Sequence, residues 1–137
     1  MFKIYITIYL LLFSNLSAEI IQKLDVKGNN RISTETIKVY GDIKIGQDYS
    51  AFDIDEILKN LYNTEFFEDI KISLIDGVLN LLVKEYPTIN FVDLKGEKSN
   101  QIKKTILEKL QLKTKESFIE SKLAQDLKLI KKKTNKC

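Results

Sequence analysis

The sequence predicts an α+β fold of the order β-α-α-β-β, in which a three-stranded mixed sheet carries two helices on one face, followed by a truncated second copy. Three observations lead to this prediction. Two alternating apolar runs flank an Asp-Gly pair, apolar residues at helical spacing precede them, and part of the pattern restarts after the only proline, Pro87. The 137 residues are enough for one domain, or for two small ones if the repeat divides the chain.

Residues 1–18 are predicted to be a cleaved export signal. Lys3 supplies an early positive charge, residues 4–13 are almost wholly apolar, and small and polar residues lead to Ala18. The apolar stretch is about half of the ~20 residues that a membrane-spanning helix needs. We therefore expect export to the periplasm rather than a permanent anchor. The alternative is a buried strand or helix of the mature fold, but the stretch has no polar alternation.

The first strand is predicted over residues 20–28. Its alternation places Gln22, Leu24 and Val26 on one face, as in a half-buried strand, and a turn begins at Gly28.

Two helices are predicted to follow this strand. The first begins at Ser33 or Thr34 and ends at Gly41, which takes the usual C′ role. The second begins near Asp53, which forms a capping-box pattern with Glu56. Its apolar stripe, at i, i+3, i+4 and i+7 spacing, consists of Ile54, Ile57, Leu58 and Leu61.

A β-hairpin closes the unit, because residues 70–74 and 78–83 flank Asp76-Gly77, a pair that suits a type I′ turn. The second of these strands is the more continuously apolar, so we expect it to be central and the first to lie at an edge. Pro87 then ends the first domain, residues 19–87.

After Pro87 the pattern restarts. Leu24 to Gly28 align with Val92 to Gly96 at an offset of 68 residues, and six apolar positions recur at an offset of 69. These pairs are Ile37 with Ile106, Ile43 with Leu112, Tyr49 with Phe118, Ile54 with Leu123, Leu58 with Leu127, and Leu61 with Ile130. Residues 88–137 are therefore predicted to be an incomplete second domain that lacks its hairpin strands, as in a fragment or a prematurely terminated reading frame.

Composition excludes several classes of enzyme. The chain has no histidine and a single cysteine, Cys137, so His-based triads, the usual zinc sites and an internal disulfide are ruled out. An acid–base enzyme would have to use carboxylates such as Asp53, Asp55 and Glu56. Their place at a helix start already accounts for them by capping and by the helix dipole. We predict no catalytic residue, no metal ligand and no cofactor.

Charge is distributed unevenly along the chain. Residues 1–94 hold nine basic and fourteen acidic side chains, whereas residues 95–137 hold thirteen and five, giving about −5 and +8. Nucleic-acid binding is nevertheless disfavoured, because Arg31 is the only arginine and aromatic residues are not interleaved with the lysines. The lysines instead suit solvated helix faces.

Four motifs carry a resemblance to a known family. They are Val26-Lys27-Gly28-Asn29-Asn30-Arg31-Ile32-Ser33, Ile45-Gly46-Gln47-Asp48-Tyr49-Ser50, Leu61-Tyr62-Asn63-Thr64-Glu65-Phe66-Phe67-Glu68-Asp69-Ile70, and Tyr86-Pro87-Thr88-Ile89-Asn90. In this order the chain resembles POTRA (polypeptide-transport-associated) domains, in particular the first two repeats of Gram-negative outer-membrane β-barrel assembly factors.

The resemblance implies a function in the periplasm at the outer membrane. Such repeats bind unfolded outer-membrane protein precursors by β-augmentation and dock accessory assembly lipoproteins. The membrane would be reached only through a C-terminal barrel, which this chain does not contain. An alternative is a POTRA-bearing secretion or cell-division scaffold, which would carry a true spanning helix before the domain or a transport barrel after it.

The expected client-binding site is the edge strand over residues 69–74. Its members are Asp69, Ile70, Lys71, Ile72, Ser73 and Leu74. Lys71 and Ser73 are expected on the open face of the sheet, with the N–H of Ser73 pointing outward; Ile72 represents the other register. The competing interpretation is that polar groups such as Lys71 only keep this edge from pairing.

Overall fold

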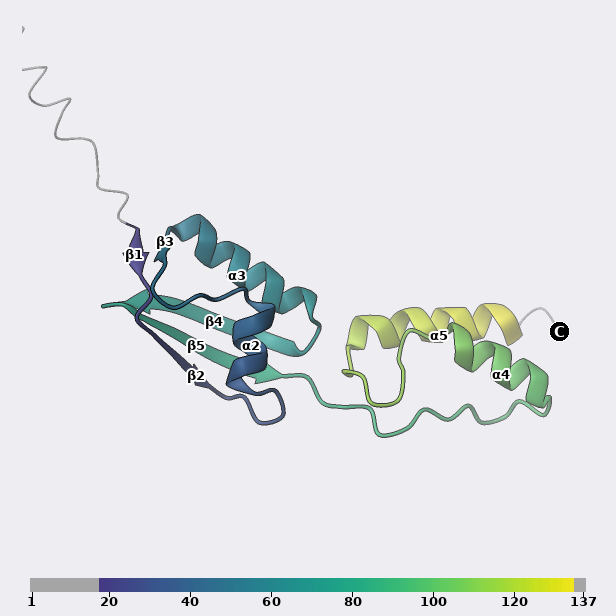
Figure 1. Ribbon diagram of the computed structural model, residues 1–137. Coiled ribbons are helices and arrows are strands. Elements are labelled where there is room, and N and C mark those ends of the chain that lie inside the picture. Colours follow the sequence, from purple (N-terminus) through teal and green to yellow (C-terminus); the bar gives the residue numbers. More distant parts are fainter. Residues whose placement is uncertain (1–17, 135–137) are drawn as a thin grey trace, which may run out of the picture.

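The computed structural model describes residues 18–134 and contains a sheet with two helices, followed by a pair of helices (Figure 1). We call residues 19–87 the first unit and residues 88–134 the second unit. Apart from Ala18, the predicted export signal lies outside the described residues. The elements are β1 (Glu19–Ile20), β2 (Lys23–Lys27), α2 (Thr34–Tyr40), β3 (Asp48–Tyr49), α3 (Ala51–Asn63), β4 (Phe67–Ile75), β5 (Val78–Glu85), α4 (Asn100–Lys109) and α5 (Glu120–Thr134).

The main sheet has the predicted three-stranded, mixed form. Its strand order is β2-β5-β4, so β5 is central, with β2 parallel and β4 antiparallel to it. The hairpin turn is also confirmed: Asp76 and Gly77 have φ of 49° and 74°, the two positive values that a type I′ turn requires. The prediction that β4 is an edge strand is therefore correct.

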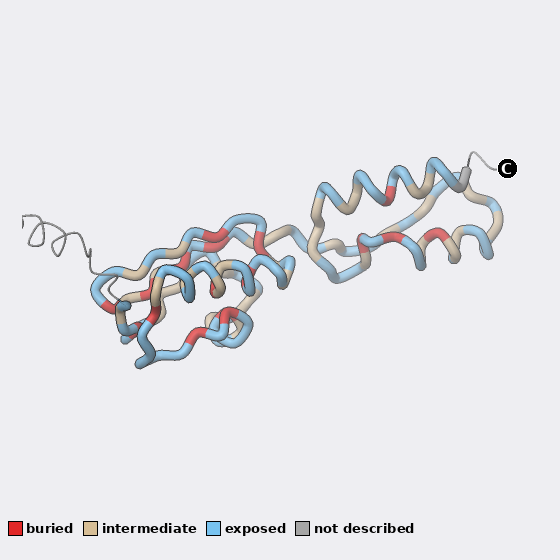
Figure 2. The backbone as a smooth tube through the Cα atoms, turned by 90° about the horizontal axis from the view of Figure 1, so that it is seen from above, coloured by how far each residue is buried: buried red, intermediate tan, exposed pale blue. Residues whose placement is uncertain are grey.

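Both helices of the first unit cover the same face of this sheet (Figure 1). The central strand buries alternate residues, Leu79, Leu81 and Val83, against Ile37 of α2 and Leu61 of α3. Figure 2 shows that buried positions are concentrated in this sandwich. Burial of apolar surface between the helices and the sheet is thus the main source of stability of the first unit.

The predicted first strand is divided in two. The small sheet of β1 and β3 pairs Glu19 with Tyr49, and the chain then passes through Ile21, which is fully buried, before β2 begins. The N–H of Ile21 donates to Gln47 O at 3.1 Å, so the main chain turns toward β3 there rather than toward β5. Gln22 is consequently exposed, contrary to its predicted place on the face of Leu24 and Val26.

The helix ends differ from the predicted ones by a few residues. Ser33 caps α2, as predicted, but Gly41 has a φ of −74° and the positive value, 51°, belongs to Asp42. Helix α3 begins earlier than predicted. Its N-cap is Ser50, which forms a capping box with Asp53, so Asp53 occupies the third helical position.

The second unit contains α4 and α5 but no strand is assigned between residues 89 and 98, where the repeat predicted one. A single bridge pairs Thr88 with Ser117, and the carboxylate of Asp126 accepts the N–H groups of Gln111 and Leu112 at 2.8 and 3.0 Å. These contacts hold the loop between the helices. Within residues 18–134, no helix has the length and apolarity needed to cross a bilayer.

Candidate strand-binding edge

The six predicted site residues all lie in β4, at the edge of the main sheet. From Ile70 to Ile75 the register with β5 is regular, pairing Ile70 with Val83 and Ile75 with Val78. Within the described part of the chain, the strand order places no neighbour on the outer side of β4. An edge of this kind offers main-chain donors and acceptors to another strand.

The side chains of β4 alternate as predicted. Ile70 is buried, and Ile72 and Leu74 are half-buried against the core beneath the helices. Lys71 and Ser73 are exposed on the opposite, open face. A strand added here would therefore present one row of side chains toward the helices and the other toward solvent.

The main-chain direction along β4 differs from the predicted one. The N–H of Ile70 donates to the hydroxyl of Tyr62 at 3.1 Å and so points away from β5. Because main-chain groups in an antiparallel pair point alternately toward and away from the partner, those of Ile72 and Leu74 also point outward. The N–H of Ser73 points toward β5, so the expectation that it faces outward is wrong.

Helix α3 forms one wall of this edge. The helix packs along β4. Tyr62 of its last turn is 40% exposed, and its hydroxyl accepts the hydrogen bond from the N–H of Ile70. Asp55 and Lys59 share this side of the helix, at i−7 and i−3 from Tyr62. The side chains that α3 presents on this side are therefore aromatic and polar.

One end of the edge is closed. The register shifts between Phe67 and Asp69, as in a β-bulge, and an exposed ion pair joins Glu68 to Lys84 at 2.8 Å. Bulges and charges of this kind oppose pairing with another strand. The outward main-chain groups that remain available are therefore those of Ile72 and Leu74.

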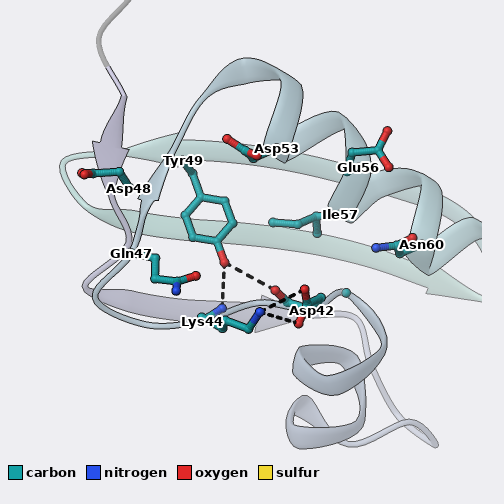
Figure 3. A pocket seen from close by; sticks show the side chains of 10 residues that line it. Asp42, Lys44, Gln47, Asp48, Tyr49, Asp53, Glu56, Ile57 and Asn60 are labelled. Atoms are coloured by element: carbon teal, nitrogen blue, oxygen red, sulfur yellow. Dashed lines mark hydrogen bonds and ion pairs between the residues drawn. The ribbon is translucent and has the colours of Figure 1, made fainter.

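A hollow of about 180 Å³ near the start of α3 offers no catalytic arrangement (Figure 3). The hydroxyl of Tyr49 accepts the N–H of Lys44 at 2.8 Å, and the Lys44 ammonium pairs with Asp42 at 3.1 Å. Hydrogen bonds from the hydroxyl and then the N–H of Ser50 lower the pKa of Asp53. A general acid needs a raised pKa, so the lowered pKa suits a structural role in which Asp53 completes the capping box with Ser50.

The described residues hold no cluster of three or more histidine, cysteine or carboxylate side chains that could bind a metal ion.

No protein-family profile matches the chain.

Comparison with curated proteins gives relatives of one kind. The chain is 35% identical over 107 residues to the outer membrane protein assembly factor BamA of Neisseria meningitidis serogroup B, which covers 77% of this chain and 13% of that protein. It is 28% identical over 101 residues to BamA of Buchnera aphidicola, which covers 72% of this chain and 16% of that protein. The chain thus spans a small fraction of the length of these relatives.

Comparison with solved structures supports the fold. The N-terminal domain of Omp85 from Thermosynechococcus elongatus aligns with a TM-score of 0.57 and 16% identity, covering 83% of this chain and 50% of that one. POTRA domains 1–2 of Omp85 from Anabaena align with a TM-score of 0.53 and 11% identity, covering 89% and 82%. The fold is POTRA-like, and the sequence is similar to part of the BamA assembly factors rather than to an enzyme.

Proposed function

We propose that this chain is a periplasmic POTRA segment of an outer-membrane β-barrel assembly factor, and that the outer edge of β4 binds strands of unfolded outer-membrane proteins. The similarity to proteins named as outer membrane assembly factors supports the first part. The second part depends on one observation. The outward main-chain groups of Ile72 and Leu74 lie in the strand at the end of the strand order, along which α3 packs.

Binding in this mode is β-augmentation, in which main-chain hydrogen bonds give affinity and side-chain spacing gives modest selectivity. The outward groups of Ile72 and Leu74 would form only a few such bonds. A disordered client must also be ordered when it docks. Weak and broadly selective binding is therefore expected, which suits a protein that handles many unfolded clients in turn.

The remaining parts of the proposal concern organisation. We infer that residues 1–18 are an export signal, that residues 19–87 form one POTRA domain, and that residues 88–137 are part of a second one. The apolar correspondence at offsets of 68 and 69 residues supports the last inference. Accessory assembly lipoproteins are the proposed docking partners, by the resemblance to POTRA domains alone.

The decisive experiment changes the outward N–H of β4 without changing the ladder to β5. Ile72→Pro removes a donor from the outer side, whereas Ile72→Ala shortens the side chain and keeps the N–H. Both variants are first checked for folding by circular dichroism. Affinity for a fluorescent peptide from an outer-membrane barrel strand is then measured by anisotropy.

The expected result is that Ile72→Pro binds the peptide at least several-fold more weakly than Ile72→Ala. Ser73→Pro is a structural comparison, because it removes an N–H that points toward β5 and should destabilise the hairpin. Equal peptide affinity of the folded Ile72→Pro and Ile72→Ala variants would mean that β4 is not the client-binding edge.

A further inference from the structure

Lys71 lies on the open face of the sheet, in the middle of the proposed client-binding edge. Two other lysines of this face have carboxylate partners: Lys27 pairs with Asp25 at 3.4 Å, and Lys84 pairs with a carboxylate of β4 at 2.8 Å. Within the described residues Lys71 forms no ion pair, and its neighbour on β5 is the aliphatic Leu82. The charge of Lys71 is thus available to a group that comes from outside the sheet.

The main-chain direction of β4 decides what would lie beside this lysine. The main-chain groups of Lys71 point toward β5, since those of Ile70 and Ile72 point outward. In an antiparallel pair, opposite residues whose main-chain groups point away from each other form the closer kind of pair, with Cα atoms about 4.5 Å apart. A client residue opposite Lys71 would occupy such a position, where cross-strand side chains interact directly.

The two rows of side chains on a docked strand would meet different surfaces. Ile72 and Leu74 are half-buried and keep apolar surface at the edge, whereas the core-facing residues of the central strand are buried. Aliphatic client residues on that face would cover the remaining surface. The other row would lie on the open face, beside Lys71 and Ser73. The edge thus suits a strand that alternates between apolar and polar residues, as transmembrane β-strands do.

Two interpretations of Lys71 lead to opposite expectations. A lysine on an edge strand can serve to oppose pairing with any other strand. The side chain of Lys71, however, lies on the open face, while the outward main-chain groups belong to Ile72 and Leu74. A charge in this position attracts an opposite charge on the adjoining strand and repels a like charge. Selection among clients therefore fits the geometry better than exclusion of all of them.

We propose that Lys71 determines the specificity of this edge and selects antiparallel client strands that carry an acidic residue opposite it, in a polar row between aliphatic residues. This inference rests on the proposed function of the β4 edge. The preference is modest, because a cross-strand pair of opposite charges changes affinity only about 1.4- to fivefold.

The test compares two fluorescent peptides that differ at one position. Both alternate valine with threonine, and the central threonine is replaced by glutamate in one peptide and by lysine in the other. Anisotropy gives the affinity of the whole chain for each peptide. The ratio of the two affinities is compared among variants, because this ratio does not depend on the fraction of each variant that is folded.

Lys71→Glu reverses the charge at the edge. Lys27→Glu is the matched control, because Lys27 lies beside the same Leu82 from the opposite side, on β2. Wild type and Lys27→Glu should bind the glutamate peptide more tightly, and Lys71→Glu should bind the lysine peptide more tightly. An unchanged preference in Lys71→Glu overturns the inference. An equal change in Lys27→Glu also overturns it, because the preference would then come from general attraction between charges.

Lys71→Ala separates selection from exclusion. It should bind the glutamate peptide more weakly than wild type does, and tighter binding of both peptides would mean that Lys71 only opposes pairing. Failure of the proposed function gives a different result. If neither peptide binds, or if Ile72→Pro binds both as tightly as Ile72→Ala does, the β4 edge is not a client site and the inference fails with it. If binding depends on Ile72 but the preference does not follow the charge at position 71, only the assignment to Lys71 fails.

Discussion

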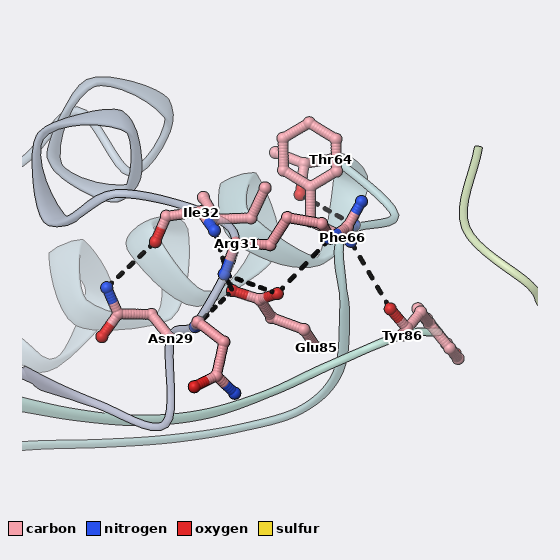
Figure 4. A network of polar contacts seen from close by, with 8 residues as sticks. Asn29, Arg31, Ile32, Thr64, Phe66, Glu85 and Tyr86 are labelled. Atoms are coloured by element: carbon pink, nitrogen blue, oxygen red, sulfur yellow. Dashed lines mark hydrogen bonds and ion pairs between the residues drawn. The ribbon is translucent and has the colours of Figure 1, made fainter. Parts of the chain in front are cut away.

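Glu85 accepts the main-chain N–H of Arg31 through both carboxylate oxygens, at 3.0 and 3.2 Å, and the Arg31 Nε lies 3.5 Å from Glu85 Oε2 (Figure 4). The same carboxylate accepts the N–H groups of Asn30 and Ile32, each at 2.9 Å. The Glu85 side chain is only 9% exposed. One carboxylate at the end of β5 therefore fixes the turn that joins β2 to α2.

Replacement of Glu85 by alanine should lower the free energy of unfolding by about 1–3 kcal/mol, because it leaves three N–H groups without their acceptor. Glu85→Gln is the matched variant. It keeps one oxygen acceptor and loses the charge, so its loss should be smaller. Urea denaturation of both variants at pH 7 measures the difference, and equal stability of wild type and Glu85→Ala would contradict the structural role.

The same site predicts a pH dependence. Burial alone would raise the pKa of Glu85, but the N–H groups of Ile32, Arg31 and Asn30 and the Arg31 charge outweigh it and lower the pKa below its ordinary 4.5. The stabilisation is therefore present above about pH 4.5 and is lost as pH falls through the lowered pKa. Acid titrations of unfolding should show a shallower loss in Glu85→Gln than in wild type.

Gly28 and Gly46 give a matched pair for backbone strain. Their φ values are 85° and 87°, but a Cβ on Gly28 would lie 2.1 Å from Val83 O, whereas nothing lies within 4 Å of one on Gly46. Gly46→Ala should cost about 1 kcal/mol from the left-handed backbone. Gly28→Ala should cost about 2–4 kcal/mol, because β5 must also move. Thermal melts giving similar losses for both would contradict the close approach of Gly28 to β5.

Tyr62→Phe tests the hydrogen bond that blocks one outward donor of the proposed client-binding edge. It removes the hydroxyl that accepts the N–H of Ile70 and keeps the ring. Stability should fall by about 0.5–1.5 kcal/mol. If β4 binds client strands, the freed donor should strengthen peptide binding roughly two- to tenfold, by the same free energy. Weaker binding would mean that Tyr62 contacts the client directly or that the edge is not the site.

The hairpin and the sheet order were predictable because each depends on local chemistry. Asp76-Gly77 tolerates the two positive φ values of a type I′ turn, and few residue pairs do. The strand with the more continuous apolar run is favoured at the centre of a sheet, and β5 lies there.

The direction of the Ser73 N–H was predicted wrongly, although the turn determines it. A two-residue loop at Asp76-Gly77 makes Ile75 and Val78 a hydrogen-bonded pair, so the main-chain groups of Ile75 and of Ser73 point toward β5. The interruption at Ile21 was not predictable in this way, because the groups that bind its main chain, those of Gln47 and Gly46, belong to a distant loop.

The last prediction concerns the independence of the two units. The core cluster that includes Ile21 and Val83 lies wholly within the first unit, so a piece of residues 19–87 should unfold in one sharp transition. In the second unit, the buried apolar residues are Ile106, Leu110 and Leu112 among those described. A piece of residues 88–137 should therefore be largely disordered.

Contacts between the first and the second unit contribute little to the stability of either. Lys122 pairs with Glu65, and Phe118 N–H donates to Pro87 O at 2.7 Å, but an exposed ion pair and one hydrogen bond contribute only about 1–2 kcal/mol together. Circular dichroism melts of the two pieces and of the whole chain make the comparison. The first piece should melt within a few degrees of the main transition of the whole chain. A sharp transition in residues 88–137 alone would contradict the expectation that the second unit is largely disordered by itself.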